Sequence, residues 1–438
     1  MRRNGLVNEL FQIVKRFDLM DSSLRIIVTG LIAQHRSLGG VAWDYLNVVL
    51  GLRRLGHDVY YVEDSGEWPY NFDGGPSGND WVAHDPTSSV EYLASVMKEF
   101  GLSNNWAYRF PTTSVWFGLS EGKRTDLIRS ADMLINVSGT LEKPETYRQV
   151  RRLVYIDTDP VFTQIDIADS NSDLRERVNA HDVHFTVGEC IGQGLPTTGH
   201  RWYATKHPIV LSEWRSSGPH RNTFTTVMNW TSYKPINYRG QTYGQKDVEF
   251  VKFMTLPEHV YPMQLEVALP KLHHVSWQGN YETVSDRLRA LIGTDLRWTP
   301  QDILKQLGWR IADATDTCGD FNTYRRYIQT SKGEWSIAKN AYVKAKSGWF
   351  SGRSACYLAA GRPVIVEDTG FDSVLPIGDG VLSFKTLEEA ESDIREVEAN
   401  YNRHANAATE IAEAYFDSDK VLARLLEIGM NTKASTAD

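Results

Sequence analysis

Cysteine is scarce in this sequence, with only three among 438 residues. Cys190, Cys318 and Cys356 lie far apart and show neither metal-ligand nor redox spacing, which argues against a disulfide framework and indicates a reducing compartment. Long apolar runs are missing as well: none approaches the about 20 residues of a membrane-spanning helix. The Met-Arg-Arg start also lacks the apolar core of a signal peptide. We therefore expect a cytoplasmic protein without stable membrane insertion.

An excess of basic residues is missing too, since 47 lysines and arginines face 55 acidic residues and leave a formal charge of −8. This balance argues against nucleic acid or an anionic membrane as a partner. What is present, 41% hydrophobic and 23% charged residues, is typical of a globular protein. A chain of 438 residues favours two domains over a single core.

The first half of the chain alternates strands and helices. Residues 1–20 predict an amphipathic helix, because apolar side chains recur there at helical spacing. Residues 24–28, 41–55 and 57–63 predict a strand, a helix and a second strand, which together start a parallel sheet. Further strands of this sheet are predicted at 133–137, 153–157 and 184–187, and a long surface loop at 68–86.

The pattern restarts after a polar, turn-rich stretch at residues 215–219, which suits a joint between domains. Strands are then predicted at 224–228, 309–313, 334–338 and 364–367 and near Val275, and helices at 320–330, 351–360, 387–401 and 407–430. We therefore predict an α/β protein of two doubly wound, Rossmann-like domains that face a central cleft. They span residues 21–213 and residues 214–438, and a C-terminal helix closes the second.

Residues 347–370 are the most informative stretch. They predict a glycine-containing loop, a helix that begins near Ser351, a turn, and a buried strand that ends at Glu367. A helix start fed by such a loop presents free N–H groups and the positive end of the helix dipole, which suits a phosphate. Arg353, in the first turn, could hold a diphosphate oxygen with its planar fork. The same pattern also fits an ordinary helix–turn–strand unit without a ligand.

Taken together, these features resemble the GT-B glycosyltransferases, in which two Rossmann-like domains hold a nucleotide-sugar between them. The resemblance covers essentially the whole chain after residue 20. It rests on the Gly39-Gly40 pair that opens the first helix, on residues 55–59 before the second strand, and on residues 348–369. Cys356 stands where many relatives carry a glutamate that grips the donor ribose, and Arg353 where some carry a donor-binding arginine. Residues 39–45, 155–160, 229–230 and 348–353 more narrowly resemble a poorly characterised bacterial branch.

The resemblance implies transfer of a sugar from a nucleotide diphosphate donor to a hydroxyl or amine acceptor, a small molecule or a glycan. It implies no metal and no cofactor besides the UDP-, GDP- or TDP-sugar itself. The donor is expected mainly at the second domain. The residues expected to contact it are Gly39, Gly40, Asn229, Trp230, Lys246, Gly348, Trp349, Phe350, Ser351, Gly352, Arg353, Glu367, Asp368 and Thr369.

Four side chains of the first domain are candidates for the base that deprotonates the acceptor: His35, Asp44, Asp157 and Asp159. An imidazole titrates near neutrality, and Asp44 falls near a helix start, where the dipole stabilises a carboxylate. Asp157 and Asp159 end a predicted strand. Two carboxylates at this spacing could also chelate a divalent ion, but their surroundings favour the acceptor side of the cleft, and we predict no metal site.

Two other functions stay open at this point. A nucleotide-sugar 2-epimerase of the same fold would need carboxylates that flank the hexose carbon. A non-catalytic two-domain protein would bind a ligand without turnover. A nicotinamide oxidoreductase fits less well, because residues 188–194 lack the Gly-x-Gly-x-x-Gly order of a dinucleotide-binding loop. The oligomeric state does not follow from the sequence.

Overall fold

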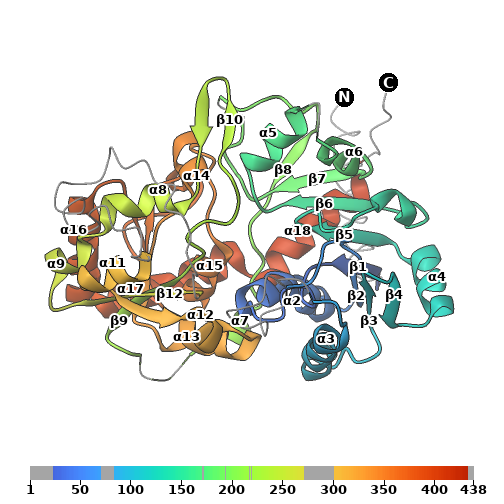
Figure 1. Ribbon diagram of the computed structural model, residues 1–438, viewed down its shortest axis with the longest axis horizontal. Helices are drawn as coiled ribbons and strands as arrows, with labels where there is room; N and C mark the ends of the chain where they lie inside the picture. Colours follow the sequence, from blue (N-terminus) through green and yellow to red (C-terminus); the bar gives the residue numbers. More distant parts are fainter. Residues whose placement is uncertain are drawn as a thin grey trace, which may run out of the picture.

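The computed structural model describes residues 23–70, 83–169, 172–192, 194–216, 218, 220–270 and 300–432. The helix predicted at 1–20, most of the loop predicted at 68–86 and the strand predicted near Val275 lie outside these ranges. The described chain forms two α/β bodies, each built on its own sheet (Figure 1). The predicted α/β class with two doubly wound sheets is therefore confirmed. Within these ranges, no helix combines the length and the apolar character of a membrane-spanning segment.

The first sheet has eight strands in the order β4-β3-β2-β1-β5-β6-β7-β8. Neighbouring strands run parallel, except that β3 and β4 pair antiparallel at one edge. Strand order reverses between β1 and β5, and ligands in such sheets bind at the carboxyl ends beside this reversal. The strands are β1 (Arg25–Thr29), β2 (Asp58–Glu63), β3 (Trp106–Phe110), β4 (Val115–Gly118), β5 (Met133–Val137), β6 (Leu153–Asp157), β7 (Val183–Thr186) and β8 (Trp202–Ala204).

The second sheet has six parallel strands in the order β13-β12-β9-β14-β15-β16. Its order reverses between β9 and β14, which is a second switch point of the same kind. The strands are β9 (Thr223–Val227), β12 (Gln264–Leu269), β13 (Arg310–Asp313), β14 (Gly333–Ser336), β15 (Val364–Glu367) and β16 (Val381–Phe384). A separate two-stranded hairpin, β10 (Ile236–Tyr238) and β11 (Gln241–Tyr243), extends from this body.

Helices surround both sheets (Figure 1). Those of the first body and the connection are α2 (Gly39–Arg54), α3 (Thr87–Glu99), α4 (Glu121–Ser130), α5 (Phe162–Ala168), α6 (Leu174–Asn179) and α7 (Leu211–Trp214). Those of the second body are α8 (Lys246–Phe250), α9 (Leu256–Val260), α11 (Pro300–Gln306), α12 (Ala314–Cys318), α13 (Phe321–Thr330), α14 (Asn340–Ala345), α15 (Gly352–Ala359), α16 (Leu387–Ala399) and α17 (Tyr401–Ile411). The last helix is α18 (Ser418–Asn431).

The single helix predicted at 407–430 is broken. α17 ends in a π-helical turn, Ala412–Phe416, and the side chain of Asp417 then accepts a hydrogen bond from the backbone N–H of Asp419 and caps α18. The break lets α18 return to the first body, where Gly51 of α2 lies against Leu422 and Gly429 lies against Met133 of β5. The C-terminal helix thus completes the core of the first body rather than that of the second.

The chain crosses between the bodies at two places that are bonded to each other. The backbone N–H of Ile209 donates to the carbonyl of Phe416 (2.7 Å), and the N–H of Ser418 donates to the carbonyl of Ile209 (2.9 Å). Ile209 and Asp417 form an isolated parallel bridge. We call these two crossings, at residue 209 and at residues 416–418, the hinge strands.

Candidate active site between the two sheets

A cavity of about 590 Å³ lies between the two bodies, and both sheets direct their carboxyl ends at it. The first body contributes residues at or just after the ends of β5, β6 and β7, and the second contributes residues at or just after the ends of β9 and β12. These are Val137, Ile156, Thr158, Val187, Val227, Met228, Asn229 and Pro270. His207 and Pro208, next to the hinge strands, and Leu422 of α18 also line it. Its volume lies in the range of small-molecule sites.

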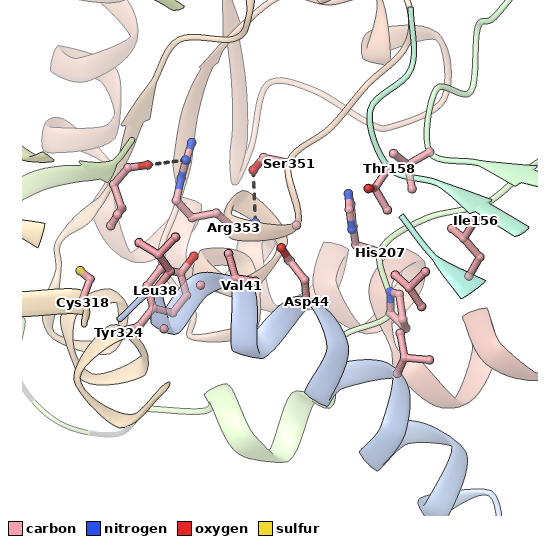
Figure 2. A pocket seen from close by; sticks show the side chains of 18 of the residues that line it. Leu38, Val41, Asp44, Ile156, Thr158, His207, Cys318, Tyr324, Ser351 and Arg353 are labelled. Carbon is pink, nitrogen blue, oxygen red and sulfur yellow. Dashed lines mark hydrogen bonds between the residues drawn. The ribbon is translucent and has the colours of Figure 1, made fainter. Parts of the chain in front are cut away.

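Two helices begin at this cavity, one from each body. Gly39 and Gly40 of α2 and Ser351 and Gly352 at the start of α15 all line it. No side chain caps the N-terminus of α2, whereas the hydroxyl of Ser351 accepts a hydrogen bond from the N–H of Arg353 at 3.2 Å (Figure 2). The free N–H groups of both helix starts make this wall of the cavity suitable for an anion.

Gly39 is required by packing as well. A Cβ at this position would lie 2.1 Å from the carbonyl oxygen of Asp320, which precedes α13 in the second body. Only glycine therefore lets the start of α2 approach α13 this closely. Gly40 lies against the ring of Tyr324 in the same contact.

Arg353 reaches the cavity with a guanidinium that the protein already holds in place (Figure 2). Its Nε donates to Glu334 (2.5 Å), and its two terminal nitrogens donate to the carbonyl of Val227 and to the hydroxyl of Ser336 (both 2.6 Å). The remaining N–H groups of the fork stay available. Because rotation of the side chain is blocked, the positive charge is presented in one orientation.

Lys246 stands near this arginine but has no acidic partner within ion-pair distance among the described residues. Burial lowers the pKa of its ammonium group well below the ordinary value, and the positive charges of Arg353 and Lys339 lower it further. Three cations thus gather in one region, while Lys246 itself lies outside the residues that line the cavity. Arg353 and Lys339 are already paired with Glu334 and Asp159, so the charge that a bound anion would stabilise here is mainly that of Lys246.

Asp44 projects from α2 into the cavity toward the start of α15 (Figure 2). It is exposed to the space of the cavity, and no described residue donates a hydrogen bond to it. Protein nevertheless surrounds the cavity on several sides, and this burial raises the pKa of the carboxyl group to about 7, while the charge of Arg353 acts in the opposite direction. Asp44 can therefore exchange a proton near neutral pH.

His207 is a cavity residue that sequence reasoning did not select. Its ring stands beside Gly352, where a Cβ would lie 3.1 Å from Cγ, and its Nε2 is buried without a hydrogen-bond partner. Burial lowers the pKa of the imidazole to about 4, so it is neutral at pH 7. Thr158 and Lys206 were also missed. The position of His207 next to the predicted joint, which must border the cleft, was the available signal.

The other three candidates for the base are placed differently. His35 lies outside the cavity lining and stacks on Tyr70, with ring centroids 5.1 Å apart, and burial lowers its pKa to about 4. Asp157 is buried, and its carboxylate accepts bonds from the hydroxyls of Thr163 (2.7 Å) and Thr186 (2.8 Å) and from the amide of Gln164 (3.0 Å). Asp159 is bonded to residues of the second body.

The residues predicted to contact the donor divide into two sets. Gly39, Gly40, Asn229, Trp349, Ser351, Gly352 and Arg353 line the cavity, whereas the remaining ones do not. The ring of Trp230 is 1% exposed in the core beside Phe250, and that of Phe350 packs on Phe371 and Phe416. Both rings are therefore placed to stabilise the second body.

The residues at the end of β15 also bond internally. Glu367 accepts from the N–H of Ala338 (3.1 Å) and shares its site with Glu249, which together with burial raises its pKa well above the ordinary value. Asp368 pairs with Lys346 (2.7 Å) and Lys385 (3.3 Å).

The remaining two predicted donor contacts fix the loop before α15. The hydroxyl of Thr369 donates to the carbonyl of Trp349 (2.5 Å), and Gly348 lets the backbone approach Cys190. Across the described ranges, no group of three or more His, Cys, Asp or Glu side chains is arranged to hold a metal ion.

Solved structures of known proteins share this architecture, although the sequence itself has no match. No protein-family model matches the sequence, and no curated protein matches it. An α-glucosyltransferase in complex with UDP-glucose and DNA containing an abasic site superposes with a TM-score of 0.54 at 14% identity, over 93% of this chain and 99% of its own. HepE from Anabaena, in complex with UDP and glucose, superposes with a TM-score of 0.53 at 12% identity, over 92% and 98%.

The chain has the GT-B fold. In GT-B terms, the cavity lies in the cleft between the two domains, and α15 begins at its second-domain wall.

Proposed function

We propose that this protein is a GT-B glycosyltransferase that moves a sugar from a nucleotide diphosphate donor to a hydroxyl or amine acceptor. The domain built on the second sheet would bind the donor, and the domain built on the first sheet, which α18 completes, would bind the acceptor. The observation that carries the proposal is the meeting of two helix starts with Arg353 in one cavity at the carboxyl ends of both sheets. UDP-glucose in the complex of the α-glucosyltransferase and UDP in that of HepE support a nucleoside diphosphate as the ligand.

The diphosphate would lie against the start of α15 and Arg353, while Lys246, behind the cavity lining, would add positive charge near them. Charge that develops on the leaving diphosphate is then stabilised by groups that are already in place, which lowers the barrier without reorganisation. Two cations and a helix start can take the role that a divalent metal has in other transferases. We therefore propose a metal-independent reaction.

Asp44 is the base that the geometry favours among the four candidates. It faces the cavity without a hydrogen-bond donor from the described residues, and its pKa of about 7 suits proton transfer at neutral pH. The carboxylate of Asp157, in contrast, is saturated by bonds from its own domain.

The acceptor is proposed to be a small molecule or a glycan rather than nucleic acid. DNA is present in the complex of one structural neighbour. The formal charge of −8 on this chain, however, opposes the phosphate contacts that dominate DNA affinity.

A thermal-shift screen against UDP, GDP, TDP and their sugars, with and without magnesium, tests the proposal. At a ligand concentration a hundred times the dissociation constant, the protein should gain about 2.7 kcal/mol of stability. Stabilisation by one nucleoside diphosphate, unchanged by magnesium, supports the proposal and identifies the base. Absence of stabilisation by all of them refutes the donor site.

A further inference from the structure

Asp159 is surrounded by side chains of the other domain. It lies just after β6 of the first domain, and both of its carboxylate oxygens are 3.0 Å from the Nζ of Lys339, just before α14 of the second. The hydroxyls of Tyr233 and Tyr342, also from the second domain, donate to the same carboxylate. We call Asp159, Lys339, Tyr233 and Tyr342 the clasp.

Aromatic packing reinforces these polar contacts. The ring of Phe162, at the start of α5, meets that of Tyr233 edge-on at 4.9 Å and that of Tyr342 at 6.2 Å. The ammonium of Lys339 stands over the rings of Tyr233 (4.4 Å) and Phe162 (5.0 Å). Lys339 is 16% exposed and Asp159 33% exposed, so the ion pair is partly withdrawn from water. Such a pair is stronger than an ordinary surface salt bridge.

The clasp and the hinge strands lie on different sides of the cavity. Next to the hinge strands, His207, Pro208 and Leu422 form one wall. Toward the clasp, the wall is formed by Trp349, whose ring packs on that of Tyr342 at 4.5 Å. Figure 1 shows the clasp side at the upper edge of the molecule, where the β10–β11 hairpin lies beside α5.

From this arrangement we infer that the clasp holds the two domains closed over the cavity in the absence of ligand, and that it must open for substrates to enter or leave. The two crossings of the chain at the hinge strands are covalent and stay together in any such motion. The bonds to Asp159 and the packing on Phe162, in contrast, join one domain to the other without a covalent link. Through Tyr342 and Trp349, the clasp is one aromatic ring away from the cavity, so a ligand that displaces Trp349 also disturbs the clasp.

The chain offers a matched control inside one domain. Asp64 of the first domain accepts bonds from the guanidinium of Arg109 and from the hydroxyl of Tyr147 (2.8 Å), and it is 12% exposed. Asp64→Asn thus removes the same kind of carboxylate from a cation and a tyrosine as Asp159→Asn does. Only Asp159 joins the two domains.

Hydrogen exchange and small-angle scattering on the full chain without ligand test the inference. In D159N, amide exchange in α5 and the β10–β11 hairpin should accelerate about tenfold, equivalent to ~1.4 kcal/mol, and the radius of gyration should increase. D64N should change neither quantity at these positions. Equal exchange and equal radius in D159N and the unaltered protein would overturn the inference.

The double variant Y233F/Y342F provides a second test, because it removes two hydroxyls and leaves all charges and rings in place. It should accelerate exchange at the same segments by a smaller factor than D159N does. If it accelerates exchange throughout the second domain instead, the tyrosines serve that domain's stability and the clasp is refuted.

The consequence for catalysis rests on the proposed function and is measured separately. An opened cleft admits water, so D159N should hydrolyse the donor sugar several-fold faster relative to transfer than D64N does. If the unaltered protein consumes no nucleotide-sugar, the proposed function fails while exchange and scattering still decide on the clasp. If the unaltered protein does consume the nucleotide-sugar and D159N shows the same ratio of hydrolysis to transfer as D64N, the clasp has no role in excluding water.

Discussion

The two walls of the cavity differ in how firmly hydrogen bonds hold their charged side chains. On the wall of the second domain, three hydrogen bonds from the guanidinium fix Arg353. On the wall of the first, Asp44 faces the cavity with no bond from any described residue. A fixed cation suits a ligand whose charge is constant, such as a diphosphate. An unbonded acid suits a group that must gain and lose a proton during a reaction.

Removing the fixed cation should have the largest effect on donor binding. We expect R353Q to lose about 2–5 kcal/mol of binding free energy for the nucleoside diphosphate, the usual cost of removing one partner of a buried charge contact. Isothermal titration calorimetry measures it.

The matched control for this variant is R221Q. Arg221 also pairs with a glutamate of the second sheet, Glu266 (3.0 Å), but it lies outside the cavity lining. Equal losses of affinity in both variants would show that Arg353 acts through stability alone.

Removing the unbonded acid should affect turnover rather than donor binding. Burial raises the pKa of Asp44 to about 7, so the base is protonated below this pH and the rate should rise as pH increases through 7. D44N should lower kcat by about 10²–10⁴-fold and abolish this rise, while D157N should keep it. A pH–rate profile of D44N that still rises through 7 would assign the base elsewhere.

Lys246 is a useful comparison, because it is a half-buried cation without an ion pair like that of Arg353 with Glu334. K246M should weaken nucleoside diphosphate binding about tenfold, the effect of a hydrogen bond to a charged group. The same change should raise the melting temperature of the free protein, since the cost of burying an unpaired charge disappears. Calorimetry measures the expected loss of affinity, and thermal unfolding measures the expected rise in melting temperature. A lowered melting temperature would contradict the assignment.

Asp157 should affect the stability of the protein and not its turnover. D157N disturbs a buried carboxylate that holds Thr163, Gln164 and Thr186 together, so we expect a loss of about 1–3 kcal/mol in the free energy of unfolding. Chemical denaturation measures this loss. A drop in turnover without a loss of stability would show that Asp157 has a catalytic rather than a structural role.

Much of the fold could be predicted from the sequence, because strands that are buried on both faces form short apolar runs. β5 and β6 begin and end at the predicted residues. β12 was missed, since Gln264 and Glu266 interrupt its apolar pattern. The antiparallel edge strand β4 was missed as well, because it is only four residues long and none of them is fully buried. The break before α18 carried a signal that was overlooked: Asp417 precedes Ser418 and Asp419, a typical helix start.

The candidate site was less predictable. The carboxyl-end rule indicated Asn229 and the start of α15, and both line the cavity. The direction of a side chain is not encoded in the local pattern. Trp230 follows Asn229 yet points into the core, and Phe350 does so next to Trp349. His207 lies in a segment without regular periodicity, so its place at the cavity depends on contacts distant in sequence.

The return of α18 to the first domain also sets an order of events during synthesis. The sheet that α18 covers is made long before residues 418–431, so Met133 and the apolar face of α2 lack this cover while the second domain is still emerging. Domains usually fold as units in the order of their synthesis. Here the first domain reaches its final core only after the second has been made, so the first half of the chain is not expected to fold as an independent product when expressed alone.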